Sequence, residues 1–319
     1  IDRVKSKWTY LQKSGIFFFR NRRGMHKLES QTYKSKLQTS SEDFKKNKDS
    51  MLGMLKEIDL LLDEAEAGGG PDHHERLAAR GKLPVRERIF HFLDPDSPFL
   101  EISGLAGYKS DYPVGGGAVA GVGVCAGIEC IIFANDPTVL AGAMHYYSVK
   151  KWMRSMAIAR DCRIPFIQFV ESAGGDLRPR GAMSAGSMGH FAESGRQFYE
   201  ITELSKLNIP TVTVTFGTAT AGGAYQPGMS DYNIFVKDQA DVALAGPPLV
   251  QMATGEISSR EDIGGAKMHA EKSGLAEYLA DDDLDGIRIA REVMSHLNWH
   301  KEGSSPRFKI KPPLYDQED

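Results

Sequence analysis

FIQFVESAGG (residues 166–175) and TVTVTFGTATAGGAY (residues 211–225) are two versions of one structural unit. Each is an apolar run, typical of a buried strand, that leads directly into a Gly-Gly turn. An Ile-Pro pair opens each run, at residues 164–165 and 209–210, so the unit repeats after 45 residues. Residues 190–206, between the two units, have a helical pattern. Strands that alternate with helices indicate crossover connections and largely parallel pairing, so the sequence predicts an α/β fold.

The segments on both sides continue this pattern. Apolar runs separated by a glycine turn predict a hairpin, and apolar residues at three- and four-residue steps predict amphipathic helices. The expected strands are residues 119–124, 128–134, 232–236 and 241–245, and the expected helices are residues 41–67, 84–93, 148–161 and 286–297.

The chain divides into four expected segments. Residues 1–24 are basic and precede Met25, so they are interpreted as upstream or artificially added sequence, or as an organellar presequence. Residues 25–70 are expected to form an N-terminal helical extension and residues 71–302 the main domain. Residues 303–319 contain three prolines and are expected to be a linker towards a missing further domain.

The composition excludes several classes of protein. The 319 residues are 41% hydrophobic and 25% charged, which is typical of a globular protein. The net charge of −3 argues against nucleic acid as a partner, and no apolar run reaches the roughly 18 residues of a membrane span. The three cysteines lack C-x-x-C spacing, so we expect no disulfide framework and no Cys-rich zinc site. A reducing compartment is the simpler location.

The sequence contains no G-x-S-x-G elbow, P-loop or H-E-x-x-H motif. Glu171, Asp176 and Asp231 flank the glycine turns, where they act either as general acid–base carboxylates or as groups that cap helices and order the loops. The two Gly-Gly turns remain as candidates. The first amides of a helix have no intrahelical partner, and two such turns that converge provide a pair of donors for a developing oxyanion.

A basic run precedes the hairpin. Clustered positive charge is compatible both with binding of phosphate groups and with an ordinary solvated face, so both interpretations stay open. Its members are Arg76, Arg80, Lys82, Arg86 and Arg88.

Six segments of the chain resemble one family, the biotin-dependent acyl-CoA carboxylases. The similarity is to the N-terminal half of their carboxyltransferase (β) subunit, and it runs in order from about Glu29 to Trp299. The runs GPPLV and ATGE resemble the methylcrotonyl-CoA and geranyl-CoA branch more than the propionyl-CoA branch. The segments are RGKLPVRERI (80–89), FLEISGLAGY (99–108), GGGAVAGVGVCAG (115–127), TATAGGAYQPGMSDYNIFV (218–236), LAGPPLVQMATGE (244–256) and DIGGAKMHAEKSG (262–274).

This resemblance implies a crotonase-like fold (the ClpP/crotonase class), a spiral of ββα units with helices at its N-terminus. It also implies a reaction in which carboxybiotin, held on a separate carrier protein, releases CO2 that is attacked by the enolate of an acyl-CoA. Backbone amides stabilise the oxyanions. By resemblance, the oxyanion hole corresponds to Ala173 and Gly174, with Gly222 and Gly223 lining the same pocket. The family usually reads Ser-Gly-Gly-Ala in the first loop, so the Ala173 methyl group narrows the approach or shifts the loop by one residue.

The implied ligand and partners follow from the same resemblance. We expect CoA phosphates to contact Arg80, Lys82, Arg86, Lys150 and Lys151, and we expect no metal in this chain. The expected partners are a biotin carboxylase or biotin carrier subunit, the missing C-terminal carboxyltransferase half, and further copies of the chain in a homo-oligomer. The expected location is the bacterial cytoplasm, or the mitochondrial matrix if the basic N-terminus is a presequence.

Two other functions stay open at this point. One is a crotonase-like enoyl-CoA hydratase, isomerase or CoA-ester decarboxylase that works alone, with Glu171 or Asp176 over the pocket. The other is a non-catalytic assembly module, because this half alone lacks the biotin site.

Overall fold

The computed structural model describes residues 34–176, 188–300 and 315. The described residues fall into two units, one within residues 1–60 and 304–319 and one within residues 61–303. The second unit contains the sheet and both glycine turns. The segment boundaries expected at residues 24, 70 and 302 stay predictions.

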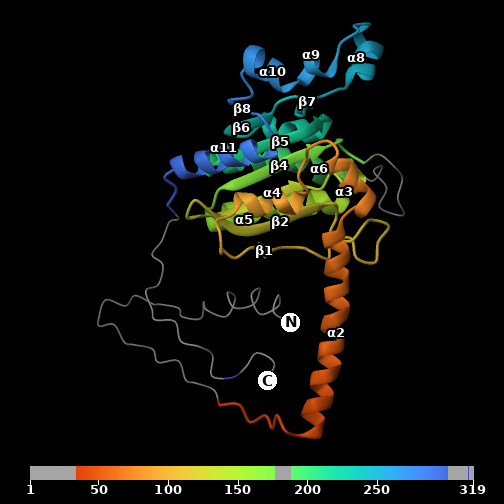
Figure 1. The fold of residues 1–319 in the computed structure, drawn as a ribbon, viewed down its shortest axis with the longest axis vertical. Coiled ribbons are helices and arrows are strands. Elements are labelled where there is room, and N and C mark those ends of the chain that lie inside the picture. The colour runs from red at the N-terminus through yellow and green to blue at the C-terminus, as the bar shows by residue number, and fades with distance from the viewer. Residues whose placement is uncertain (1–33, 177–187, 301–314, 316–319) are drawn as a thin grey trace, which may run out of the picture. The chain divides into compact units, whose positions relative to one another are not determined.

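The sheet has the strand order β1-β2-β3-β4-β5-β6-β8, with β7 paired to the end of β5 (Figure 1). β1, β2 and β3 pair antiparallel, and the remaining strands pair parallel. The strands are β1 (Leu100–Glu101), β2 (Ala118–Cys125), β3 (Ile128–Asn135), β4 (Phe166–Ser172), β5 (Thr211–Thr220), β6 (Tyr232–Val236), β7 (Asp241–Ala243) and β8 (Tyr278–Ala280).

The 45-residue repeat of the sequence is the register of the two central strands. Ile167 of β4 pairs with Val212 of β5, and Phe169 pairs with Val214. Both strands are buried along most of their length, as expected for strands covered on both faces. The repeat therefore places the two glycine turns at neighbouring strand ends.

Helices cover both faces of the sheet (Figure 1). On one face, α4 and α11 pack against the strands, and on the other face α5 and α6 do so. The helices are α2 (Glu42–Ala67), α3 (Pro71–Ala78), α4 (Val85–Phe92), α5 (Tyr146–Cys162), α6 (Met188–Lys206), α7 (Tyr225–Gly228), α8 (Pro247–Thr254), α9 (Arg260–Gly264), α10 (Ala266–Met268) and α11 (Asp283–His296). Short helical turns are η1 (Leu140–Gly142), η3 (Ala221–Ala224) and η4 (His269–Ser273).

These packing faces follow from the apolar periodicity of the sequence. Trp152 and Met156 of α5 are buried one turn apart against β3, and Ile287 and Ala290 of α11 are buried against β5 and β6. Helical residues three and four apart share a face, so each helix offers one apolar stripe to the sheet.

Most expected elements are confirmed, with differences at the turns. The helix start expected after the first glycine turn falls on residues 177–187, which lie outside the described part, and the next described helix, α6, begins at Met188. The second turn opens the short helix η3. The expected strand 241–245 ends at Ala243. The helix α3 was not predicted, because Gly70-Pro71 was interpreted only as the end of α2, whereas proline at the first position of a helix also starts one.

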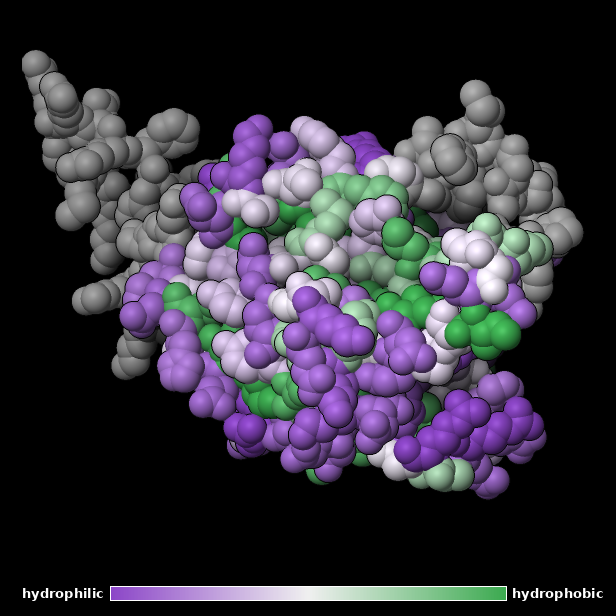
Figure 2. Space-filling view, turned by 90° about the horizontal axis from the view of Figure 1, so that it is seen from above, coloured by the Kyte–Doolittle hydropathy of each residue, from purple (hydrophilic) through white to green (hydrophobic). Residues whose placement is uncertain are grey.

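The end of the molecule that carries α8, α9 and α10 is mostly hydrophilic, with hydrophobic surface in separate patches (Figure 2). The helix α8 buries none of its residues, and Leu249 and Met252 are exposed. In the first unit, α2 likewise exposes apolar residues, among them Met51 and Met54.

Candidate active site

The two glycine turns lie against each other. A Cβ atom added to Gly174 would lie 3.0 Å from the Thr220 carbonyl oxygen and 3.8 Å from the Cβ of Ala221. One added to Gly223 would lie 3.4 Å from the Cβ of Ser172. Gly174 also has a φ of 93°, a conformation that side chains disfavour. Glycine is therefore required here both for the backbone conformation and for the close approach of the loops.

Strained backbone surrounds this contact. Ala141 and Ala221 each have a φ of 52°, in the left-handed region that non-glycine residues rarely adopt. Ala141 is in η1, which neighbours the first loop, and Ala221 begins η3. Such conformations persist where the surrounding structure imposes them, and they cluster at functional sites.

The amides of the first loop differ in their availability. The Ala173 N–H donates to the Ala141 carbonyl oxygen at 3.1 Å, and the Gly174 N–H donates to the Ser172 hydroxyl at 3.2 Å. Within the described residues, the Gly175 N–H has no acceptor. The expectation that Ala173 contributes a donor needs revision, since its amide is used inside the loop. The available donors are shifted by one residue, to Gly174, whose bond to a rotatable hydroxyl is replaceable, and Gly175.

In the second loop, Gly222 lies in the first turn of η3, where N–H groups have no intrahelical partner. The buried Gly223 packs on Ser172. Gly222 is thus the candidate donor of this loop, and Gly223 packs against the end of β4.

A cavity of about 520 Å³ opens beside the two loops. Its walls come from α3, η1, and the ends of β4, β5 and β7. Small and apolar residues form much of the wall, and charged residues lie around them. The lining residues are His73, Arg76, Leu77, Arg80, Pro137, Thr138, Ala141, Glu171, Ser172, Ala173, Thr218, Thr220, Asp241, Ala243, Gly246 and Arg260.

The charges of this cavity are not equally free. Arg260 donates to Asp241 at 2.8 Å, and Glu171 is paired with Lys82 and Arg88. Arg76 and Arg80 are exposed, and neither makes an ion pair within the described part of the chain. The unneutralised charge of the cavity is therefore positive, which suits a phosphate group.

Of the five residues expected to contact phosphates, only Arg80 lines this cavity. Lys82 is paired with Glu171, Arg86 forms two hydrogen bonds with Glu101 at 2.8 and 3.1 Å, and Lys150 lies over the Tyr146 ring. Lys82 and Arg86 are thus paired with carboxylates of the protein, and Lys150 contacts a nearby aromatic ring. Arg260 was not predicted, and no motif in the sequence marks it.

Lys151 is a buried structural residue. Its side chain donates to the carbonyl oxygens of Gly115 and Ala118, at 3.1 and 2.6 Å, and the residue is 2% exposed. Burial lowers the pKa of Lys151 from 10.5 to about 8. It therefore does not offer a phosphate contact, and it fastens α5 to the 115–118 turn instead.

We expect Lys151 to make stability depend on pH. Between pH 8 and about 10.4 the unfolded chain holds this proton more tightly than the folded chain, so the free energy of unfolding rises with pH in that window. Relative to Lys151→Met, which cannot titrate, the wild-type protein should gain up to about 1.4 kcal/mol per pH unit. Urea unfolding of both proteins at pH 7, 8, 9 and 10 measures this, and parallel curves would contradict it.

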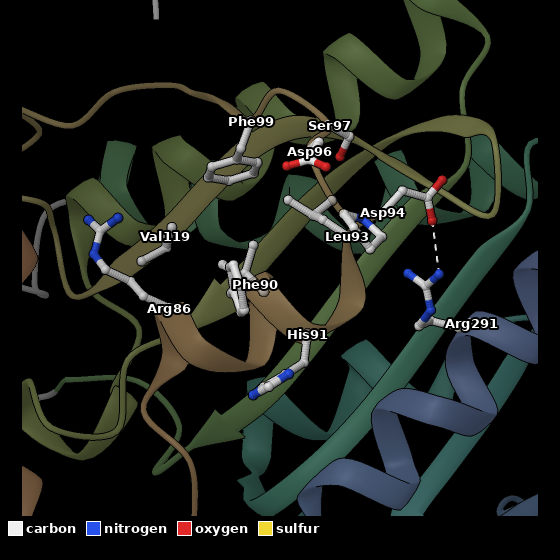
Figure 3. Close-up of a pocket in the computed structure, with 12 residues that line it drawn as sticks. Arg86, Phe90, His91, Leu93, Asp94, Asp96, Ser97, Phe99, Val119 and Arg291 are labelled. Carbon is white, nitrogen blue, oxygen red and sulfur yellow. Dashed lines mark hydrogen bonds and ion pairs between the residues drawn. The ribbon is translucent and has the colours of Figure 1, made fainter. Parts of the chain in front are cut away.

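A second cavity, of about 480 Å³, lies beside α4 and α11 (Figure 3). Phe99 and Val119 contribute to its apolar wall, and the Arg291–Asp94 ion pair at 2.9 Å lies at its edge. It shares no lining residue with the first cavity, and neither glycine turn reaches it. We therefore place the candidate active site at the first cavity.

The described ranges contain no helix long and apolar enough to cross a membrane. Within the same ranges, no group of three or more His, Cys, Asp or Glu side chains is arranged to hold a metal ion. The three cysteines are free thiols, Cys125 and Cys130 buried and Cys162 exposed.

The largely parallel sheet, with two adjoining glycine turns at the ends of its central strands, is an α/β fold of the kind that the crotonase-like resemblance implies. The comparisons with known proteins refine this class. The model of the carboxyl transferase domain matches residues 76–319, and the chain belongs to that family.

Two curated relatives carry the same assignment. A probable biotin-dependent acyl-coenzyme A carboxylase beta2 subunit of Mycobacterium tuberculosis is 48% identical over 270 residues, which are 85% of this chain and 50% of that protein. A probable mitochondrial methylcrotonoyl-CoA carboxylase beta chain of Drosophila melanogaster is 37% identical over 99% of this chain and 57% of its own length. The chain thus spans about half the length of the curated relatives it matches.

Solved structures agree with the fold. The beta subunit of geranyl-CoA carboxylase from P. aeruginosa superimposes with a TM-score of 0.75 at 39% identity, covering 89% of this chain and 52% of that one. The transcarboxylase 12S subunit, solved with methylmalonyl-coenzyme A and as a hexamer, gives a TM-score of 0.69 at 26% identity, over 77% and 48% of the two chains. The resemblance and the crotonase-like fold expected from the sequence are confirmed.

Proposed function

We propose that this chain is the acyl-CoA-binding half of the carboxyltransferase of a biotin-dependent acyl-CoA carboxylase. Its substrate would be a methylcrotonyl-CoA-like or geranyl-CoA-like thioester. The observation that carries the proposal is the contact of the two glycine loops beside a cavity whose unneutralised charge is positive. The relatives support the class of reaction, and the geometry supports the part that this chain plays in it.

The residues of the chain bind and orient the thioester. Arg76 and Arg80 hold phosphate groups of CoA at the cavity, and the thioester oxygen lies between the Gly174 or Gly175 amide and the Gly222 amide. These donors stabilise negative charge on that oxygen as the enolate forms. Carboxybiotin, on its own carrier, would supply the CO2, and we assign no residue of this chain to it.

A hydratase or isomerase that works alone is less well supported. Such an enzyme needs a carboxylate free to move a proton, whereas Glu171 is held by two cations. Asp176, the other carboxylate expected over the pocket, is not among the residues that line the cavity. Asp231 accepts hydrogen bonds from the backbone and side chain of Thr211, so it orders the start of β5.

The partners in this proposal are a biotin carboxylase or biotin carrier subunit, a C-terminal carboxyltransferase half, and further copies of the chain. The exposed apolar residues of α8 lie next to Gly246 of the cavity wall, which supports coverage of this end by further protein. The proposed location is the cytoplasm of a bacterium, or the mitochondrial matrix, since several relatives are named as mitochondrial proteins.

A coupled assay tests the function. The chain is first incubated with enoyl-CoA esters, and then with a biotin carrier, a biotin carboxylase and a C-terminal carboxyltransferase half. Carboxylation that requires every component supports the proposal. Hydration or isomerisation by the chain alone supports the hydratase, and CoA-ester binding without carboxylation in the full mixture supports an assembly module.

We predict that Arg76→Gln with Arg80→Gln weakens binding of CoA esters about tenfold at low salt and flattens the salt dependence of the affinity. Each substitution removes a charge-assisted phosphate contact, and exposed contacts are screened by salt. Isothermal titration calorimetry at two salt concentrations measures the effect. Lys150→Gln is the matched control, since Lys150 is exposed but does not line the cavity. Unchanged affinity in the double variant would move the phosphate site elsewhere.

A further inference from the structure

The ladder between β4 and β5 is interrupted at Glu171. Val170 pairs with Thr215, but Ser172 pairs with Ala219, so one residue of β4 faces three residues of β5. The pairing of β4 with β3 ends earlier, at Phe169. Irregularities of this kind redirect side chains beside active sites. Glu171 itself therefore has no partner in the strand pairing, which resumes at Ser172 before the first glycine loop.

Side-chain contacts hold Glu171 in place instead. The two carboxylate oxygens of Glu171 bind different cations, Oε1 the Lys82 ammonium and Oε2 the Arg88 guanidinium at 3.0 Å. Arg88 is itself fixed by Asp283 of α11 at 2.9 Å. These partners are buried or nearly so, with side-chain exposures of 9% for Lys82, 1% for Arg88 and 2% for Asp283. Glu171 is thereby tied to the helices α4 and α11.

Two neighbouring glycines make room for Glu171. A Cβ atom on Gly217 would lie 2.7 Å from the Glu171 carboxylate carbon, and one on Gly142 would lie 2.0 Å from the Glu171 carbonyl oxygen. Because position 217 is glycine, the Glu171 carboxylate can lie over the irregular part of β5. Because position 142 is glycine, the Glu171 backbone can lie against η1. The same turn η1 accepts the Ala173 N–H through Ala141.

We propose that Glu171 is a positioning residue for the first glycine loop. Its carboxylate, held between Lys82 and Arg88, fixes the end of β4 and so sets the direction of the Gly174 and Gly175 amides. The inference rests on the proposed function, because those amides are its thioester donors. Glu171 neither donates a proton nor binds CoA in this role.

The role predicts a particular kinetic signature. Misdirected donors weaken an interaction that is made mainly in the transition state, so kcat falls while KM changes little. Glu171→Gln keeps the shape and removes the charge. In the complete carboxylation mixture we expect kcat to fall 10- to 100-fold and KM to stay within about twofold. Glu101→Gln is the matched control, since Glu101 pairs with Arg86 of the same helix α4, and we expect wild-type kinetics from it.

Lys82→Gln provides an independent variant. It removes one of the two cations, and we expect a smaller loss in kcat. In the double variant that combines Lys82→Gln with Glu171→Gln, the fold-loss in kcat should be smaller than the product of the two single fold-losses. Residues of one network do not act additively. Multiplicative losses, or a wild-type kcat for Glu171→Gln, would overturn the proposal. A loss confined to KM would also overturn it, since that is the signature of a ligand contact.

A measurement on the 319-residue chain separates this inference from the proposed function. Amide hydrogen exchange, followed by mass spectrometry, should be faster in peptides covering Ala173–Gly175 of Glu171→Gln than in the wild-type chain or Glu101→Gln. An unchanged exchange rate in these peptides would contradict the positioning role, whatever the carboxylation activity is. Absence of carboxylation by the wild-type mixture sinks the proposed function, while faster loop exchange still supports the positioning role.

Discussion

Valine at Gly174 or Gly222 is expected to reduce carboxylation by 10²- to 10³-fold or more, the loss that typically follows removal of one oxyanion donor. The two substitutions act differently. Gly174 has a φ of 93° and lies against Thr220, so valine there both strains the backbone and turns the amide away. Gly222 has only the Gln197 amide nitrogen, at 3.9 Å, near an added Cβ, so valine there mainly obstructs the approaching thioester.

The matched control is Gly228→Ala, at a glycine of α7 where an added Cβ meets nothing within 4 Å. It should retain wild-type turnover, and Ala173→Gly should be nearly neutral because the Ala173 amide stays bonded to Ala141. Turnover is measured in the complete mixture, with thermal melting as the check on folding. Near-normal turnover in both valine variants would remove these loops from the catalytic site.

The main architecture could be predicted because its signals are local and periodic. The spacing between Ile164 and Ile209 becomes the register of β4 against β5, and the apolar residues of α5 and α11 bury on the faces that their spacing predicts. Glycine is required at Gly174 by its positive φ and its contact with the Thr220 carbonyl oxygen, which the sequence pattern suggested without specifying. The pair Gly70-Pro71 has two structural interpretations in the sequence, the end of one helix or the start of the next. In the structure it follows α2 and begins α3.

The site was predicted less well, because charge along a sequence does not identify a partner in space. The basic run from Arg76 to Arg88 contains residues with three different environments. Arg76 and Arg80 are free at the cavity, Arg86 is paired at the surface of α4, and Arg88 is buried between two carboxylates. Those carboxylates belong to Glu171 and Asp283, which lie far from Arg88 along the chain, so no local sequence pattern reveals the pairing. Phosphate binding by Arg80 therefore stays a prediction, whereas Lys82 and Arg86 of the same run are paired with carboxylates of the protein.

Arg88 and Arg86 provide a direct comparison of buried and surface charge on one helix. Arg88→Met is expected to lower the free energy of unfolding by about 3–5 kcal/mol, the usual cost of leaving buried charges without their partner. Methionine retains contact with the Phe216 ring, over which the guanidinium lies at 4.2 Å, so lost packing contributes little. Arg86→Met, which breaks the more exposed pair with Glu101, whose side chains are 28% and 19% exposed, should cost about 1 kcal/mol or less. Urea unfolding at pH 7 measures both.

Removal of the Arg88 charge should destabilise its two carboxylate partners, Glu171 and Asp283, to different extents. Glu171 keeps Lys82. Among the residues that the structure describes, Asp283 keeps only the Leu83 N–H, and its second oxygen has no partner. Most of the cost of Arg88→Met should therefore fall on Asp283, and adding Asp283→Asn should restore part of the stability, because the neutral amide oxygen still accepts from Leu83 and needs no cation. If Arg88→Met costs no more than Arg86→Met, or if Asp283→Asn lowers stability further in its presence, then the buried network is not what fastens α4 to α11, and Glu171 loses the fixed frame on which its positioning of the loop depends.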